Sequence, residues 1–279
     1  MYLRTLLGAS ALALSVAAMP ALAQDAEFSG PYVGGSLGLS IPGKQGGERI
    51  EFDRDLNGSF GDTVVTAPPA NADAFARGFC NGAALTSTPI GCRDDGNRTQ
   101  YAARLGWDIQ SGNFVVGAVG EIGRNELRDS VSAYSTTPAS YTMTREIDWN
   151  AGLRLRAGYA LGGRTLVYGT GGGAYAKIDN SFATTNTVNS FAVSDKSDAW
   201  GWAAGGGIEQ KVGSNFSVGV EYLYTRYKDD DARVRVGAIA GTTPANNPFL
   251  LAGAGGTDFR RSDTSFDHHG VRATAAYRF

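Results

Sequence analysis

Beyond residue 23 the sequence lacks any apolar run of the about 18 or more residues that a membrane-spanning helix needs, so no such helix is expected there. A dominant charge of one sign is also missing, because 25 Lys and Arg accompany 27 Asp and Glu in the 279 residues. A nucleic-acid partner requires a concentrated basic face. This balance therefore predicts no nucleic-acid partner.

The N-terminal segment resembles a secretory signal peptide in its build. Arg4 precedes an apolar run, and Ala21-Leu22-Ala23 provides a small-x-small cleavage motif before Gln24. Signal peptides have this order of regions and are removed on export. We expect residues 1–23 to form a signal peptide cleaved after Ala23, and residues 24–279 to form one exported domain.

Cysteine and histidine are scarce, with two residues of each. Cys80 and Cys92 have no histidine near them in the sequence, so a zinc site is not predicted. In an exported chain, two cysteines are expected to pair in an oxidising compartment. We therefore predict one disulfide, between Cys80 and Cys92, and no metal ligands.

Glycine and aromatic residues are abundant, with 39 Gly, 13 Phe and 12 Tyr, as is typical of many short strands joined by turns. Apolar and polar residues alternate with a period of two, which indicates strands, in eight segments. These segments are residues 31–41, 99–109, 114–123, 147–161, 165–178, 199–212, 216–227 and 270–279.

The connections between these segments are of two kinds. Three are short glycine-containing turns (111–113, 162–164, 213–215), and four are long and polar (about 42–97, 130–145, 179–197 and 228–263). Short turns at one end and long loops at the other are typical of outer-membrane barrels. Because backbone groups cannot stay unpaired in lipid, the strands must close on themselves. We predict an all-β fold, a closed eight-stranded antiparallel transmembrane β-barrel; a soluble sandwich is the alternative.

Charged residues in the predicted strands lie on the face opposite the aromatic ones. In a barrel that face lines the lumen, where charges of both signs are expected to pair. The predicted lumen charge network comprises Arg104, Asp108, Glu121, Asp148, Arg154, Arg156, Glu209, Glu221 and Arg272. Within it, Arg272 is expected to face an acid such as Glu221.

The segments PYVGGSLGLS, LVYGTGGGAYAK, VGVEYLYTRY and GVRATAAYRF, in this order, resemble the outer membrane beta-barrel family, the opacity-porin-like small surface antigens of Gram-negative bacteria. The first connection, about 42–97, is longer than in that pattern. The resemblance implies residence in the cell outer membrane among its lipid and lipopolysaccharide. It also implies insertion by the barrel assembly machinery, for which Val271, Tyr277 and Phe279 match the C-terminal insertion signal.

Three other patterns suggest specific chemistry. GTGGGA at 169–174 has the form of a dinucleotide fingerprint, but no amphipathic helix follows it, so no cofactor is predicted. His269 shares a strand face with Ser265 and Asp267, whereas His268 points the other way, which leaves a lipid A-modifying enzyme as an alternative. Asp229-Asp230-Asp231 is either a solvated loop or a divalent-cation site against lipopolysaccharide.

The sequence therefore favours a structural or surface-interaction role, that of a surface antigen or an adhesin-like protein. Charged side chains are expected to plug its lumen, since eight strands leave an interior that side chains can fill. The long loops are expected to meet a host or envelope ligand. A narrow porin for small solutes is the first alternative and the lipid A-modifying enzyme the second; no catalytic residues are predicted.

Overall fold

The computed structural model describes residues 28–43, 46–194, 196–241, 244–253 and 255–279. The predicted signal peptide, residues 1–23 with its cleavage after Ala23, lies outside the described residues. No helix in the described ranges is long and apolar enough to cross a membrane.

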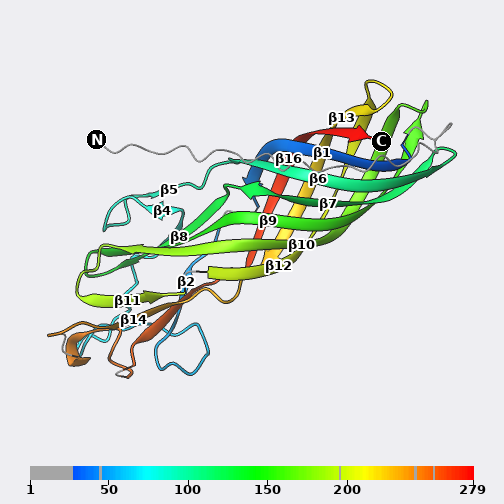
Figure 1. Cartoon of the computed structure of the whole chain (residues 1–279). Coiled ribbons are helices and arrows are strands. Elements are labelled where there is room, and N and C mark those ends of the chain that lie inside the picture. Colours follow the sequence, from blue (N-terminus) through cyan, green and yellow to red (C-terminus); the bar gives the residue numbers. More distant parts are fainter. Residues whose placement is uncertain (1–27, 44–45, 195, 242–243, 254) are drawn as a thin grey trace, which may run out of the picture.

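Eight long strands form a closed ring (Figure 1). They are β1 (Gly30–Pro42), β6 (Arg98–Ser111), β7 (Phe114–Asn125), β9 (Ala139–Leu161), β10 (Thr165–Thr184), β12 (Lys196–Lys211), β13 (Phe216–Lys228) and β16 (Ser265–Arg278). Each strand pairs antiparallel with the next in this order, and β16 pairs with β1. The prediction of a closed eight-stranded antiparallel barrel is confirmed.

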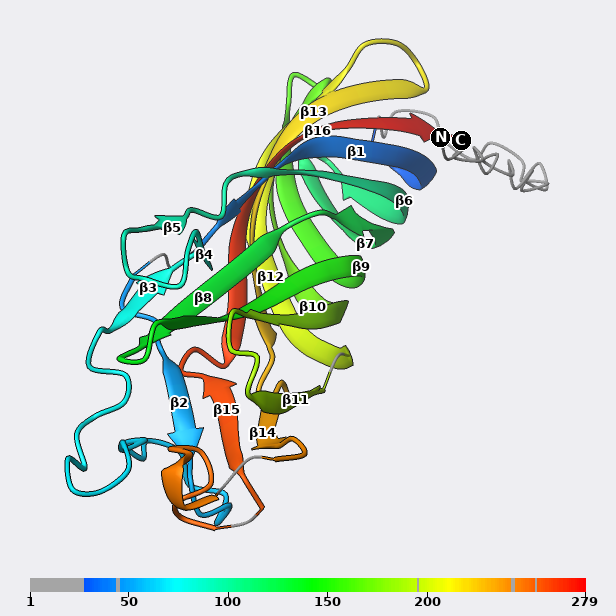
Figure 2. The ribbon, with the colours of Figure 1, turned by 90° about the vertical axis from the view of Figure 1, so that its left-hand side faces the viewer.

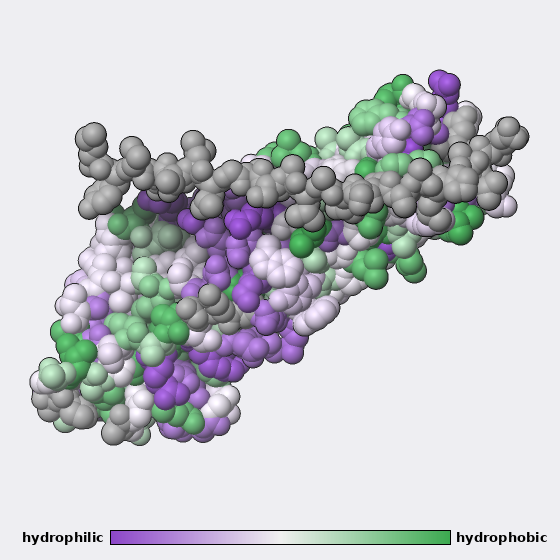
Figure 3. Space-filling view, viewed as in Figure 1, coloured by the Kyte–Doolittle hydropathy of each residue, from purple (hydrophilic) through white to green (hydrophobic). Residues whose placement is uncertain are grey.

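The two faces of the ring follow the alternation in the sequence. In β9, Leu153 and Leu155 are exposed on the outside, whereas Arg154 and Arg156 between them are buried inside. The same outward exposure holds for apolar residues of every ring strand, such as Leu39, Ile109, Val116, Val167, Ile208, Val220 and Val271. Hydrophobic side chains accordingly gather over the barrel strands in Figure 3. An apolar outer face around a polar interior is the arrangement of a membrane barrel.

The short turns lie together at one end of the ring. Gly112 and Gly162 adopt φ values of 59° and 56°, in the left-handed region that glycine tolerates without steric cost. Trp107, Phe114, Tyr159, Phe216 and Phe279 are exposed near this end, where interfacial aromatic residues are expected.

The long connections fold into a second body at the other end of the ring. They contain β2 (Ile50–Asp53), β3 (Phe79–Asn81), β4 (Ala83–Ala84), β5 (Cys92–Arg93), β8 (Arg128–Ser135), β11 (Asn189–Val193), β14 (Val234–Ala238), the 3-10 helix η1 (Pro244–Asn246) and β15 (Thr257–Arg261). Figure 2 shows β11, β14, β15 and β2, which form one four-stranded sheet, lying beyond the barrel strands. We call this body the cap: residues 46–97, 127–146, 179–194, 229–241, 244–253 and 255–264.

The cap has a hydrophobic core of its own. Phe75 lies at its centre, with ring centroids 4.5 Å from Phe52, 5.3 Å from Tyr141, 6.1 Å from Phe249 and 6.3 Å from Phe259. All five aromatic residues belong to one buried cluster. Because these residues come from the first, second and fourth long connections, the core ties separate loops into one packed unit.

The prediction of a long polar connection at 130–145 is wrong. This stretch forms most of β8 and the first seven residues of β9, which pair with each other. Its serines and threonines hydrogen bond across the pair, as between Ser132 and Thr142, whose hydroxyl oxygens are 2.7 Å apart. Val131 and Met143 are buried in the cap core. Tertiary packing and hydroxyl pairing thus make strands from a composition that resembles a loop.

The alternation of β9 is broken at Asp148. Lys177 of β10 pairs with Trp149, but the next residue, Ile178, pairs with Ile147, so Asp148 is the extra residue of a β-bulge. The bulge turns Ile147 into the interior, where it is buried, and leaves Asp148 partly exposed. The predicted inward placement of Asp148 and outward placement of Ile147 are therefore wrong.

Candidate functional site

The middle of the barrel interior holds a buried ionic cluster, here the central cluster: Glu121, Glu221, Arg104, Arg154 and Arg272. Arg154 donates two hydrogen bonds to Glu121, at 2.6 and 2.9 Å. Arg272 joins the two acids, 2.8 Å from Glu121 and 2.5 Å from Glu221. Arg104 donates to the other oxygen of Glu221 at 2.9 Å. Three guanidinium groups thus share two carboxylates, and all five side chains are buried.

A second ionic cluster, the lower cluster, lies nearer the short turns. Arg156 donates to Asp108 at 2.8 Å and to Glu209 at 2.9 Å. Arg278 donates to the same Asp108 at 2.9 Å and to the carbonyl oxygen of Phe28 at 2.7 Å. The structure thus brings eight of the nine predicted lumen residues into two adjoining clusters.

Arg278 is a lumen residue that the sequence analysis missed. It stands on the same strand face as Arg272, an even number of residues away, so the alternation of β16 contained the signal. Asp148, the ninth predicted residue, is instead at the outer rim, where its carboxylate lies 3.7 Å from the exposed guanidinium of Arg124.

Two tyrosines fill the space between the clusters. The Arg156 guanidinium lies 5.1 Å from the ring centroid of Tyr32 and 4.9 Å from that of Tyr168. The Tyr168 hydroxyl donates to Glu221 at 2.7 Å. The cavity lined by Tyr32, Arg104 and Glu209 holds only about 10 Å³, the lower limit for one water molecule.

An apolar layer closes the interior on the cap side of the central cluster. Along β13 the inward side chains after Glu221 are Leu223, Thr225 and Tyr227, all buried. Leu223 and Tyr227 belong to a cluster with eight further buried residues: Leu127, Ile147, Ala174, Ala176, Ile178, Ala199, Ala203 and Phe266. Within the described residues, ionic and apolar layers therefore follow one another along the barrel axis.

A third ionic group, the junction cluster, lies in the cap where it meets the barrel, and its Arg145 donates to the carbonyl of Ser265 on the ring strand β16 at 2.8 Å. Arg261 donates to Glu48 at 2.6 and 2.7 Å and to Asp129 at 2.9 Å. Arg145 donates to the same Asp129 oxygen at 2.7 Å and lies 3.6 Å from Asp229. Residues of β8, β9 and β15 and of the first connection are thus held together by charge-assisted hydrogen bonds.

The two acids bound by Arg261 titrate differently. Burial raises the pKa of Glu48 above its ordinary value of 4.5, and Arg261 offsets only part of this shift. Burial also acts to raise the pKa of Asp129, but the guanidinium groups of Arg261 and Arg145 outweigh it and hold that pKa below 3.8. Asp129 is therefore the acid whose charge stabilises the junction.

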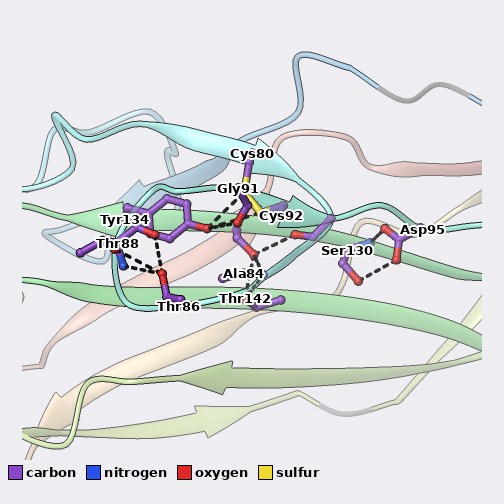
Figure 4. The surroundings of a disulfide bond; sticks show 12 residues. Cys80, Ala84, Thr86, Thr88, Gly91, Cys92, Asp95, Ser130, Tyr134 and Thr142 are labelled. Carbon is purple, nitrogen blue, oxygen red and sulfur yellow. Dashed lines mark hydrogen bonds between the residues drawn. A yellow bond between two sulfur atoms is a disulfide. The ribbon is translucent and has the colours of Figure 1, made fainter.

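Cys80 and Cys92 are joined by a disulfide in the cap (Figure 4). The hydroxyl of Tyr134 on β8 lies 3.6 Å from the Cys80 sulfur and donates to the carbonyl of Gly91 at 3.1 Å. The disulfide therefore closes a loop within the first connection, and this loop lies against β8 through the Tyr134 contacts and the pairing of β3 with β8.

The residues of the alternative hypotheses do not come together. Ser265 hydrogen bonds to Asp263 and Arg226, Asp267 accepts from Tyr224, and His269 contacts the Tyr222 hydroxyl at 2.7 Å. Within the described residues no contact joins Ser265, Asp267 and His269. The acids at 229–231 also diverge, because Asp229 faces Arg145 while Asp230 pairs with Lys228 at 2.8 Å.

GTGGGA at 169–174 lies within β10, a ring strand, and not before a helix. At Gly172 a side chain would collide with the carbonyl oxygen of Leu153 on β9. Glycine at this position therefore permits close approach of neighbouring strands.

Among the described residues, one group of acids could hold a metal ion. Asp53, Asp55 and Asp62 each place a carboxylate oxygen within 4.8 Å of the others. Asp53 and Asp55 belong to a D-x-D-x-N-G sequence at 53–58, a spacing also found in calcium-binding loops and not recognised from the sequence. Asp53 already accepts hydrogen bonds from the backbone of Asn57 and Gly58.

The closed ring, apolar exterior and paired interior charges define an integral outer-membrane β-barrel. The sequence matches the family described as outer membrane protein beta-barrel domain over residues 9–279. The chain belongs to this family.

Two relatives and one solved structure extend the comparison. A 31 kDa outer-membrane immunogenic protein of Brucella melitensis is 33% identical over 124 residues, 44% of this chain and 50% of the relative. A 22 kDa outer membrane protein of Rhizobium leguminosarum is 29% identical over 135 residues, 48% of this chain and 56% of the relative. The chain thus spans about half the length of the curated relatives it matches. The outer membrane protein OprG from Pseudomonas aeruginosa has a TM-score of 0.51 at 13% identity, over 91% of this chain and 100% of that one, and shows the fold alone.

Proposed function

We propose that the protein is a surface-interaction protein of the outer membrane, in which a plugged barrel anchors and presents the cap. One observation carries this proposal: the long connections share a packed aromatic core above an interior filled by ionic and apolar layers. A pore would need an open interior, whereas a display scaffold needs a rigid anchor and an ordered exposed surface. The immunogenic character in the names of the Brucella relatives supports the same role.

The partners follow from this arrangement. Outer-membrane lipid and lipopolysaccharide would surround the apolar ring, and a host or envelope ligand would meet the cap. We further propose cleavage after Ala23 and recognition of the C-terminal strand by the barrel assembly machinery. Val271 and Tyr277 lie on the exposed outer face of β16, and Phe279, directly after it, is also exposed, so such recognition can occur there. No nucleic-acid partner and no enzymatic activity form part of the proposal.

Surface display can be tested with antibodies raised against the folded protein. They are expected to label intact cells, and Phe75→Asp, which places a charge in the cap core, is expected to abolish most of that labelling. The variant must still show the heat-dependent gel migration of a folded barrel. Labelling only after the outer membrane is permeabilised would overturn the proposal.

A further inference from the structure

The far part of the cap contains a pocket of about 490 Å³, which is separate from the barrel interior. Segments from three of the long connections and the turn between β8 and β9 line it, including Thr66, Thr137, Asn186 and Asn247. Its volume lies within the range of about 300–1,000 Å³ typical of small-molecule sites. Loops that are separate in sequence thus converge on one concave site.

Among the described residues, the pocket lining carries no charge. Its thirteen residues include four asparagines, two threonines, one serine and one tyrosine, and none of Asp, Glu, Lys, Arg or His. Elsewhere the cap is rich in ion pairs, such as Arg260 with Glu51 and Arg235 with Asp258. A ligand with a phosphate, sulfate, carboxylate or ammonium group would lose its hydration here without gaining a counter-charge. The lining therefore favours an uncharged ligand that carries both polar groups and apolar surface.

Part of the polar lining is fixed in place by internal hydrogen bonds. The Asn186 side-chain amide donates to the Tyr141 hydroxyl at 2.9 Å and to the Asn189 side chain at 3.1 Å. Asn189 donates in turn to the carbonyl of Gly237 at 3.2 Å. These bonds orient the groups before any ligand arrives, which lowers the entropy cost of binding.

Other polar groups of the lining remain available. Within the described residues, the side chain of Asn246, the amide nitrogen of Asn247 and the hydroxyl of Thr137 have no hydrogen-bond partner. Amides and hydroxyls provide both donors and acceptors. Ala67, Val188 and Pro248, which are partly or fully exposed, add an apolar surface beside them.

We propose that this pocket binds a neutral sugar unit of a glycan. Sugar hydroxyls need uncharged donors and acceptors in close alternation, and the C–H face of the ring needs an apolar or aromatic surface; the pocket offers both. The proposal rests on the surface-interaction role above and gives it a ligand class. An uncharged peptide is the competing ligand, but the free amides gather in a concave site and do not follow a strand edge, as β-augmentation would need.

The test uses the full-length protein folded in nanodiscs and an array of oligosaccharides. Each neutral glycan on the array is paired with its sialylated and its sulfated form. We expect binding to a subset of the neutral glycans and at least about tenfold weaker binding to the charged forms. Combining Asn246→Ala with Thr137→Ala removes two ligand contacts and is expected to weaken neutral binding about tenfold or more.

The matched control is Asn97→Ala, which removes an exposed asparagine of the first connection outside the pocket and is expected to leave binding unchanged. Heat-dependent gel migration verifies that each variant is folded. Thr137→Asp, which places a charge at the pocket, is expected to abolish binding.

Three results would overturn the inference: binding of charged glycans only, neutral binding that the pocket variants leave unchanged, or binding of uncharged peptides without any neutral glycan. An array without any bound glycan would also overturn it. In that case antibody labelling of intact cells would still support surface display, so the two proposals fail separately.

Discussion

At the scale of single residues, the position of a charge along a strand decides what its removal costs. Glu221 is fully buried and accepts hydrogen bonds from Arg104, Arg272 and Tyr168. Asp148 lies partly exposed at the rim opposite Arg124. Both acids were predicted to belong to one lumen network, but their surroundings differ.

We therefore expect Glu221→Gln to lower the free energy of unfolding by about 3 kcal/mol, because it leaves buried guanidinium groups with too few carboxylates. Asp148→Asn, the matched control, should change it by less than about 1 kcal/mol, as for other exposed ion pairs. Denaturant unfolding in detergent, followed by tryptophan fluorescence, measures both. Equal effects of the two variants would contradict the placement of these acids.

The junction cluster predicts a pH dependence. Because the pKa of Asp129 is lowered by folding, its stabilising contribution is present above its ordinary pKa of 3.8 and is lost as the pH falls below that value. Because the pKa of Glu48 is raised by folding, its protonation in mild acid favours the folded state and removes no stability. Glu48→Gln mimics that protonated form.

Asp129→Asn should accordingly destabilise the cap by about 3 kcal/mol at pH 7 and progressively less below about pH 4, whereas Glu48→Gln should cost much less at either pH. The protease sensitivity of the cap, measured between pH 3 and pH 7, reports the difference. A Glu48→Gln variant that is as sensitive as Asp129→Asn at pH 7 would show that the two carboxylates are equivalent.

At the scale of elements, a charged substitution should cost more on the lipid-facing surface of a strand than on an equally exposed surface of the cap. Leu155 on β9 is 71% exposed and Ile90 in the first connection is 73% exposed, so accessibility alone does not separate them. A charge on the lipid face near the middle of the bilayer costs about 2–4 kcal/mol. We expect Leu155→Arg to make the free energy of folding into lipid vesicles less favourable by this amount and so to lower the yield of folded protein. Ile90→Arg should leave both unchanged. Similar yields for both variants would mean that β9 does not face lipid.

The closing strand carries its own prediction. Phe279, directly after β16, is exposed and packs against Tyr277, with ring centroids 5.3 Å apart. If it completes the insertion signal, Phe279→Ser should lower the amount of folded protein recovered from the outer membrane. Phe79→Ser in the cap, where Phe79 is 38% exposed against 45% for Phe279, is the control. Loss of folded protein in the control alone would argue against that role.

The ring strands could be predicted from the sequence because each one meets lipid on one face and the interior on the other, which imposes a strict period of two. The bulge at Asp148 could not be predicted, because Ile147, Asp148 and Trp149 continue the apolar–polar alternation of the rest of the strand. The cap strands were also missed. Val131 and Met143 are buried by residues far away in the chain, a tertiary effect that leaves no periodic signal in a stretch rich in serine and threonine.

At the scale of the whole molecule, the layers combine into a closed body. The lower cluster, the central cluster, the apolar layer around Tyr227, the junction cluster and the aromatic core of the cap follow one another from the short turns to the far end of the cap. Each layer is made by side chains from several strands or connections. A solute crossing the barrel would have to displace paired charges as well as packed apolar side chains, so we predict a barrel that does not conduct.

Single-channel recording in planar lipid bilayers measures whether the barrel conducts. The protein should first show heat-dependent gel migration, and an open porin recorded in the same lipid should serve as the positive control. We predict no discrete conductance steps at any voltage that the bilayer tolerates. Repeated openings of one stable size would contradict the plugged barrel and favour a narrow porin.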